Sequence, residues 1–208
     1  MDIANAFFLV FVIMFSAVIH EVMHGVAADW LGDKTARYAG RLTLNPLPHL
    51  DPVGSVLLPL FFTLTGSPIF FGWAKPVPYN PYNLKPGRFS EALVAGAGPL
   101  SNLVIAIVFG LIIRAGVFGV SVNTVLLLVV VVNTMLFLFN LLPIPPLDGS
   151  KILSSLLPHS MERAYAQWRV AIERNPFFGM GLVLLVVILL GNMFGAVVYS
   201  LASLIAGV

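Results

Sequence analysis

The feature that most constrains this chain is a series of long apolar segments separated by polar loops. They cover about residues 3–28, 92–113, 122–142 and 177–208, and a helix needs about 20 apolar residues to cross a bilayer. Of the 208 residues, 59% are hydrophobic and 10% are charged, whereas about a quarter of a soluble domain is charged. Water cannot cover so much apolar surface, so the sequence predicts a polytopic membrane protein.

A shorter apolar segment over residues 53–64 does not fit a full crossing. It is interrupted by Pro59 and closed by Thr65-Gly-Ser-Pro68, so we expect it to enter the membrane and return on the same side. Residues 161–173 contain neither Pro nor Gly and predict an amphipathic surface helix. The predicted fold is all-α, a single domain over residues 1–208 with about 4–6 transmembrane helices and one re-entrant segment.

The basic residues favour one orientation. If the re-entrant segment returns, residues 30–51, 69–90 and 143–176 share one face of the membrane. Ten of the 11 Lys and Arg residues lie in these loops, and only Arg114 falls on the other side. Because cytoplasmic loops are enriched in Lys and Arg, we expect these loops in the cytoplasm and the N-terminus outside.

Composition also excludes other classes of protein. The net charge of +2 is too small to indicate a nucleic-acid partner. The chain has no cysteine, which excludes disulfides and thiolate chemistry. The N-terminus lacks the basic region of a signal peptide, so we expect the first apolar segment to be a retained span.

Three ionisable residues cluster near the end of that first segment. His20-Glu21-Val22-Met23-His24 is an H-E-x-x-H motif, and a spacing of four places both imidazoles on one helical face, where they can bind one Zn²⁺. Glu21 would take the proton from zinc-bound water and deliver it to the leaving amine. The alternative is a set of side chains that only hydrogen-bond within a helix bundle. Such a set is costly in a membrane helix without a metal or partner, which favours the metal.

A third ligand is expected from elsewhere, since catalytic zinc sites use three protein ligands and a water. Pro143, Pro145 and Pro146 end the apolar segment over residues 122–142, and Gly149 permits a turn directly after Asp148. In the predicted topology this segment and the first both end at the cytoplasmic face, so all three ligands can lie within about 10 Å of that boundary. An ordinary Asp-Gly turn is the alternative reading of Asp148.

Further polar residues are candidates for the site. Asn140 and Asn102 could each donate a hydrogen bond to the oxyanion of a tetrahedral intermediate, and the alternative for both is a hydrogen bond between helices. His49 precedes the re-entrant segment and is a candidate to touch metal or substrate. His159 follows Pro158 in a polar connection and is expected to be solvated.

Taken together, these motifs resemble the site-2 protease family of intramembrane metalloproteases. Two motifs carry the resemblance, namely His20-Glu21-x-x-His24, and Asn140-x-x-Pro143 followed by Asp148-Gly149. It extends to residues 95–102 and 40–46, and so covers about residues 10–150. The chain shows neither the PDZ nor the CBS domain of larger relatives, which leaves the mode of substrate selection open.

The resemblance implies an intramembrane zinc endopeptidase that cuts within or near the transmembrane segments of other proteins. His20, His24 and Asp148 would hold one Zn²⁺ per chain. Glu21 would be the catalytic acid and base, with Asn140 near the metal. The implied partners are a transmembrane protein substrate and membrane lipid, without nucleic acid, and the oligomeric state is open. The expected location is the plasma membrane, with the active site near the cytoplasmic side.

Two readings from other classes compete with this one. A metal-ion transporter needs polar residues along a whole route with access from both faces, whereas the ionisable membrane residues here gather near one face. The second competing interpretation is a catalytically inactive membrane scaffold of the same fold. The intact motif argues against it.

Two segments could receive an unwound substrate. Residues 37–44 and 69–79 carry aromatic or branched residues beside Gly and Pro, a composition typical of edge strands. A short β-hairpin near the active site could therefore bind the substrate as an additional strand, or it could simply pack the re-entrant segment.

Overall fold

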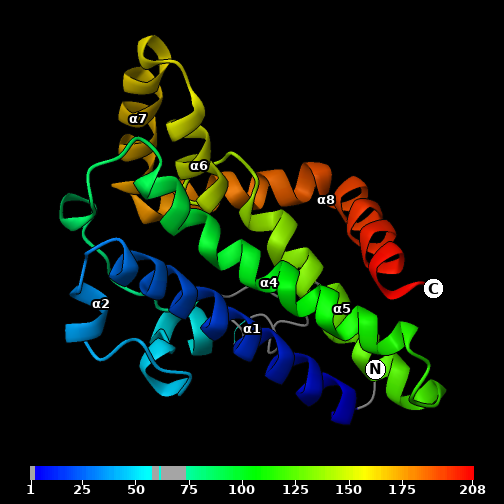
Figure 1. The fold of residues 1–208 in the computed structure, drawn as a ribbon. Coiled ribbons are helices and arrows are strands. Elements are labelled where there is room, and N and C mark those ends of the chain that lie inside the picture. Colours follow the sequence, from blue (N-terminus) through cyan, green and yellow to red (C-terminus); the bar gives the residue numbers. More distant parts are fainter. Residues whose placement is uncertain (1–2, 58–60, 62–73) are drawn as a thin grey trace. The chain divides into compact units, whose positions relative to one another are not determined.

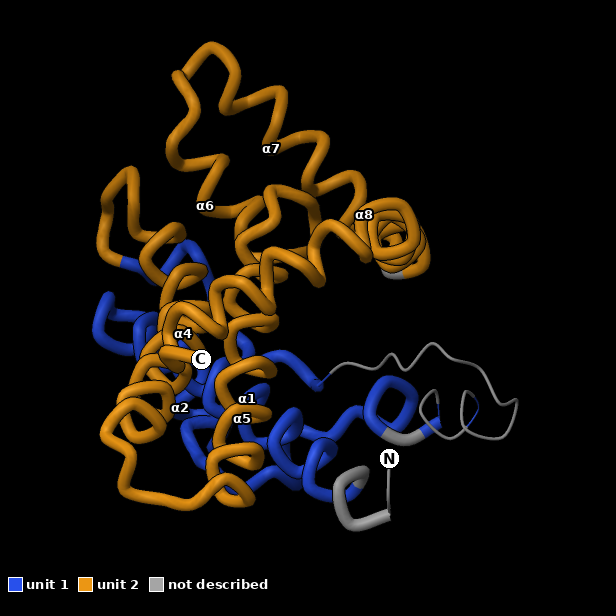
Figure 2. Tube along the Cα trace, turned by 90° about the vertical axis from the view of Figure 1, so that its right-hand side faces the viewer, with its two compact units in different colours: residues 1–84 blue, residues 85–208 orange. Residues whose placement is uncertain are grey.

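The structure is a computed structural model that describes residues 3–57, 61 and 74–208. It divides into two compact units, residues Met1–Leu84 and Lys85–Val208, coloured blue and orange in Figure 2. The single domain expected from the sequence stays a prediction.

The first unit is organised around one long helix. Helix α1 spans Ile3–Trp30, followed by the short helices α2 (Thr35–Tyr38), η1 (Leu47–His49), η2 (Pro52–Leu57) and η3 (Pro81–Asn83), as Figure 1 shows. The loops that join the short helices pack closely on α1. A Cβ at Gly25 would lie 2.6 Å from Leu42 Cδ2 and 2.8 Å from Val77 Cγ1, so only glycine allows this approach.

The end of α1 is joined to residues 80–83 by a buried carboxylate. Asp33 accepts hydrogen bonds from the backbone N–H and hydroxyl of Thr35, from the Asn80 N–H at 2.6 Å and from the Asn83 side chain at 3.0 Å. Burial alone raises the pKa of Asp33, but these hydrogen bonds to the charged form outweigh it and lower the pKa below its ordinary value. Asp33 therefore connects two segments that lie far apart in sequence.

The second unit contains five helices. They are α4 (Ser90–Arg114), α5 (Val120–Asn140), α6 (Asp148–Leu156), α7 (His159–Glu173) and α8 (Pro176–Ala206). A core forms where α4, α5 and α8 meet, and many of its residues are small, among them Ala106, Ala202 and Ala206. A Cβ at Gly110 would lie 2.8 Å from the Ile205 carbonyl oxygen. Small residues thus let these apolar helices approach closely, the usual basis of helix packing in membranes.

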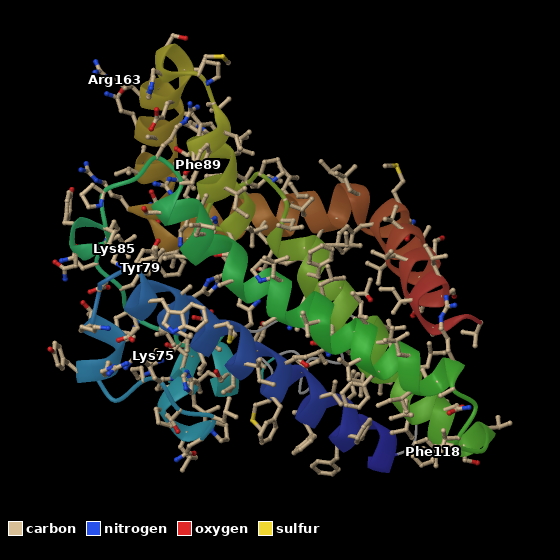
Figure 3. All side chains as sticks on the ribbon, viewed as in Figure 1. Lys75, Tyr79, Lys85, Phe89, Phe118 and Arg163 are labelled. Carbon is tan, nitrogen blue, oxygen red and sulfur yellow. The ribbon has the colours of Figure 1, made fainter. Side chains whose placement is uncertain are left out.

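Hydrogen bonds define the two ends of this unit. At one end, Arg114 donates to the carbonyls of Ile205, at 2.9 Å, and of Leu204, so the last turn of α8 lies beside the end of α4. At the other end, Arg169 on α7 pairs with Glu91 on α4 at 2.7 Å. Since α8 begins directly after α7, it runs the whole length of the unit. Figure 3 shows Arg163 on α7 and Phe118, between α4 and α5, at these opposite ends.

Among the described residues, the predicted spans are confirmed as four helices long and apolar enough to cross a membrane: Phe7–Trp30, Ser90–Arg114, Val120–Asn140 and Phe177–Ala206. The C-terminal segment is one continuous helix that runs through Gly191. The predicted amphipathic helix is present as α7. The connection before it also contains α6, which the sequence interpretation missed.

Two other expectations are not confirmed. Of the predicted re-entrant segment, Pro52–Leu57 forms a turn of π-helix, and most of the remainder lies outside the described residues. Within residues 3–57 and 74–208 there is no strand, and therefore no β-hairpin. Pro76 and Pro78 lack the N–H that a ladder needs, and Arg41 donates to the carbonyls of Lys75 and Pro76.

Candidate active site

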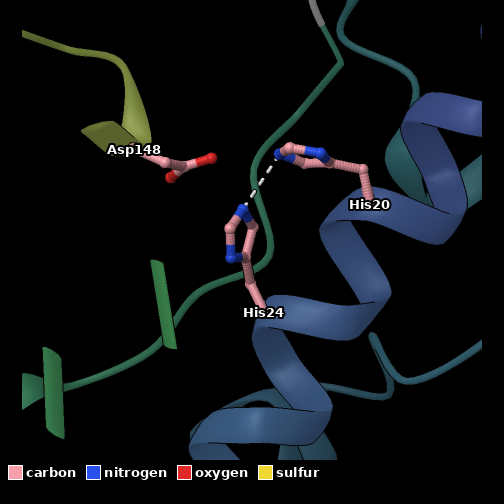
Figure 4. Close-up of side chains that lie close together, drawn as sticks. All are labelled: His20, His24 and Asp148. Atoms are coloured by element: carbon pink, nitrogen blue, oxygen red, sulfur yellow. Dashed lines mark hydrogen bonds between the residues drawn. The ribbon is translucent and has the colours of Figure 1, made fainter. Parts of the chain in front are cut away.

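The two histidines of the H-E-x-x-H motif face one another on α1. His20 and His24 are 6% and 8% exposed, and their Nε2 atoms lie 3.0 Å apart, as the dashed line in Figure 4 shows. Their rings meet edge to face at 86°. The helix accounts for this geometry, because residues four apart lie on the same face one turn from each other.

This pair fits a zinc ion. Two nitrogen ligands of one tetrahedral Zn²⁺, each at about 2.05 Å, are separated by about 3.3 Å. The observed Nε2–Nε2 distance of 3.0 Å is close to this value. Neutral imidazole nitrogens are suitable zinc ligands, so the donor set has the right chemistry.

Glu21 lies beside the pair and has a specific partner. Its Oε2 accepts a hydrogen bond from the backbone N–H of Val77 at 2.9 Å, across 56 positions of sequence. The residues that the structure describes offer Glu21 no further hydrogen-bond or ion-pair partner. One carboxylate oxygen is thus held by the protein backbone and the other can accept a proton.

Asp148 is the first residue of α6, in the second unit, and it is 8% exposed. The expected turn at Gly149 is wrong, because Gly149 continues the helix that Asp148 begins. Its conformation is helical, and glycine is needed for a different reason, since a Cβ there would lie 2.2 Å from the Leu141 carbonyl oxygen. The close approach of α6 to the end of α5 is what holds Asp148 in place.

The two asparagine candidates make contacts within the second unit. Asn102 is fully buried and donates to the Asn133 side chain at 3.0 Å, which is the bond between helices weighed as its alternative role. Asn140, the last residue of α5, donates to the Leu136 carbonyl at 2.9 Å. A part in catalysis stays a prediction for both.

The other two histidines have different surroundings. His49 is 1% exposed; its Nε2 lies 3.0 Å from the Thr43 carbonyl and its Nδ1 lies 3.4 Å from Arg41. Because a carbonyl can only accept, Nε2 carries the hydrogen and Nδ1 accepts from Arg41. The His159 side chain is 83% exposed and pairs with Glu162 at 2.9 Å, in agreement with the expected solvated position.

Sequence reasoning missed the segment that contacts Glu21. The composition of residues 69–79 favours an edge strand and gives no link between Val77 and Glu21. Pro76 and Pro78, on either side of Val77, predict an extended backbone. They do not indicate which distant side chain accepts a hydrogen bond from the Val77 N–H.

Comparisons with known proteins identify the family of the chain. The family model described as Peptidase family M50 matches residues 115–188. The chain is 38% identical over 169 residues to "Putative zinc metalloprotease YwhC" of Bacillus subtilis (strain 168). This alignment covers 77% of this chain and 74% of that relative. It is 34% identical over 161 residues to "Putative zinc metalloprotease Rip2" of Mycolicibacterium smegmatis, covering 74% of this chain and 60% of that relative. No solved structure matches the chain.

Apolar helices and a buried pair of facing imidazoles define the class, a multi-pass membrane protein with metal-binding chemistry. The sequence identity to the Bacillus subtilis relative, over most of both chains, then shows the family. The chain belongs to peptidase family M50, the site-2 protease family. Both of these relatives carry the name "Putative zinc metalloprotease".

Proposed function

We propose that this chain is an intramembrane zinc metalloendopeptidase that hydrolyses peptide bonds within or near the transmembrane segments of other proteins. The observation that carries the proposal is the pair of Nε2 atoms, 3.0 Å apart on a membrane-length helix, with Glu21 next to them. The proposed ligands of the metal are His20, His24 and Asp148.

Burial and chemistry support this ligand set. All three residues are buried, and each offers one ligand atom to a metal ion. The remaining two of the four histidines are poor candidates, because both ring nitrogens of His49 have partners and His159 is exposed. A carboxylate completes the three protein ligands that a catalytic zinc site uses, leaving a position for water.

The length of the connecting chain supports a shared membrane face for the three ligands. Asn83 is bonded to Asp33 at the end of α1, and α4 begins at Ser90. The seven residues 84–90 span at most about 25 Å when fully extended, which is less than the roughly 30 Å of a hydrocarbon core. The second unit carries the start of α4 and α6 at the same end, since Arg88 donates to the carbonyls of Ser155 and Leu157.

The chemistry assigned to the chain is general acid–base catalysis. Bound zinc would polarise a water molecule and the substrate carbonyl. The carboxylate of Glu21 takes the proton as the water oxygen attacks the carbonyl carbon. It then gives that proton to the amine nitrogen as the C–N bond breaks. Asn140 and Asn102 remain the candidates to donate a hydrogen bond to the oxyanion.

Location and substrate follow from the same proposal. We place the protein in the plasma membrane as part of this proposal. The positive-inside rule supports a site near the cytoplasmic side, where water has a short path to the metal. The substrate class is a transmembrane protein whose helix unwinds locally, because the hydrogen bonds of an intact helix shield its peptide bonds.

The deciding experiment compares the wild type with Glu21→Gln. Both purified proteins should contain zinc, and only the wild type should cut a membrane-spanning substrate in liposomes, with a loss of about 10²–10⁴-fold in the variant. Glu173→Gln, at an exposed position on α7, is the matched control and should retain both properties. A Glu21→Gln protein that cuts as fast as wild type would refute the proposal.

The same preparation tests the two rival functions. A transporter would move zinc into sealed liposomes that contain the wild type, and an inactive scaffold would bind zinc without cutting. We expect neither result, because the acidic and histidine side chains of α1 are confined to its C-terminal half, while α4 is charged only at its two ends, at Glu91 and Arg114.

A further inference from the structure

An extended segment of the first unit crosses the catalytic part of α1. Residues 74–80 have no regular secondary structure, and Pro76 and Pro78 restrict their backbone to extended conformations. Val77 at the centre is 5% exposed, and its side chain packs where Gly25 leaves space on α1.

The start of this segment is held by a buried arginine and a buried histidine. Arg41 is 8% exposed and donates to the carbonyls of Lys75 at 2.9 Å and Pro76 at 3.4 Å. His49 orients that guanidinium by accepting from it at Nδ1, and its own carbonyl accepts from the Lys75 N–H at 2.8 Å. The carbonyl and the N–H of Lys75 are therefore fixed, while the Pro76 carbonyl shares the same Arg41 nitrogen at the longer distance of 3.4 Å.

The far end of the segment is held by Asp33. Its carboxylate accepts from the Asn80 N–H at 2.6 Å and from the Asn83 side chain. Hydrogen bonds to a charged acceptor are the stronger kind. The segment is thus attached on both sides of Val77, so the direction of the Val77 N–H is determined.

That N–H points at the residue proposed to carry the proton. The Val77 N–H donates to Glu21 Oε2 at 2.9 Å. Without this bond, the Glu21 carboxylate would have no hydrogen-bond partner among the described residues and could rotate about its side-chain torsions.

We propose that Arg41 is a positioning residue for catalysis: together with His49 it holds residues 75–77 so that the Val77 N–H orients the Glu21 carboxylate. This inference rests on the proposed role of Glu21. Oε2 accepts the N–H, and Oε1 faces the attacking water and receives its proton. Arg41 touches neither metal nor substrate and acts only through the backbone of this segment.

The first test measures amide hydrogen exchange in the purified, full-length protein. Because Pro76 and Pro78 have no N–H, a peptide from this segment reports on very few amides, chiefly Lys75, Val77 and Tyr79. Glu21→Ala should speed exchange of the Val77 amide. Glu21→Gln should leave it protected, since its side-chain carbonyl still accepts.

The same measurement on Arg41→Gln should show faster exchange at both Lys75 and Val77. Arg163→Gln, an exposed arginine in the other unit, is the matched control and should match wild type. Unchanged exchange in Arg41→Gln would show that the arginine does not hold the segment, and the inference would fail.

The second test separates positioning from folding and from metal binding. In Arg41→Gln we expect kcat to fall by about tenfold or more, because small displacements of a catalytic group are costly. KM and bound zinc should stay at wild-type values, since no ligand is altered. Arg41→Lys should restore part of kcat, because its ammonium can reach one of the two carbonyls. If Arg41→Gln does not fold, the exchange and rate measurements on Arg41→Lys alone test the positioning role of Arg41.

The outcomes also distinguish this inference from the proposed function. The exchange results do not depend on cleavage, so a wild type that fails to bind zinc or to cut refutes the function without touching the contact with Val77. Loss of zinc in Arg41→Gln, or faster exchange with an unchanged kcat, would instead overturn the positioning role alone.

Discussion

At the scale of single residues, the four histidines separate by their surroundings. His20 and His24 direct the same ring atom at each other, His49 is enclosed by Arg41 and Thr43, and His159 lies at the surface. Sequence spacing identified the first pair, because a helix places residues four apart on one face whatever else the chain does. The role of His49 depended on a contact that spacing cannot reveal.

The zinc content of histidine variants should depend on whether the replaced histidine is a proposed ligand. His24→Ala removes one proposed ligand, and we expect bound zinc, measured by elemental analysis of the purified protein, to fall well below that of the wild type. Incomplete ligand sets bind zinc poorly because each ligand contributes to the binding free energy. His159→Ala should keep the full zinc content, and an equal loss in both variants would contradict the assignment.

Asp33 is expected to be important for stability in a pH-dependent way. Asp33→Asn weakens several hydrogen bonds to a charged acceptor, so the variant should be less stable at neutral pH by about 1–3 kcal/mol. The pKa of Asp33 is lower in the folded state than its ordinary value. The stability that it contributes is therefore present above about pH 4 and is lost as pH falls through the folded pKa.

Thermal unfolding in detergent checks this prediction. The wild type should unfold at the higher temperature at pH 7, and the gap to Asp33→Asn should narrow on acidification below about pH 4. A gap that is constant with pH would mean that the charge of Asp33 does not contribute.

At the scale of elements, the connection from α5 to α6 determines where Asp148 lies. The prolines at residues 143–146 predicted the end of α5 correctly, since proline cannot continue a helix. They did not predict that a new helix starts at Asp148. That start depends on packing, because the first turn of α6 lies directly against the carbonyls of Leu141 and Leu142.

Gly149→Ala tests this packing. The new Cβ would meet the Leu141 carbonyl oxygen at 2.2 Å, a backbone atom that cannot rotate away. We expect a loss of stability of about 1–3 kcal/mol or more, together with reduced zinc because Asp148 would shift. Gly181→Ala on α8 has nothing within 4 Å of the new Cβ and should behave as wild type in both measurements.

At the scale of the whole molecule, orientation in the membrane is the property that charge predicts. The chain has no cysteine, so single cysteines can be introduced and labelled without background labelling of native thiols. Phe118 is 46% exposed in the connection between α4 and α5, and Arg163 is exposed at the opposite end of the unit. Basic loops stay in the cytoplasm, which assigns Arg163 to that side.

A membrane-impermeant maleimide should therefore label Phe118→Cys in intact cells, and Arg163→Cys only after the membrane is permeabilised. The cysteine-free wild type should remain unlabelled. The reverse pattern would place α6 and α7 outside the cell and would contradict a cytoplasmic active site.

The sequence by itself determined the apolar spans and the imidazole pair, and it predicts the role of Glu21. These features depend on composition and on the helical period, which act within one segment of chain. Only the tertiary structure decided that α6 begins at Asp148 and that the Val77 N–H meets Glu21 across 56 positions. Hydrogen bonds between distant segments depend on how the loops close around α1, and no local pattern encodes that closure.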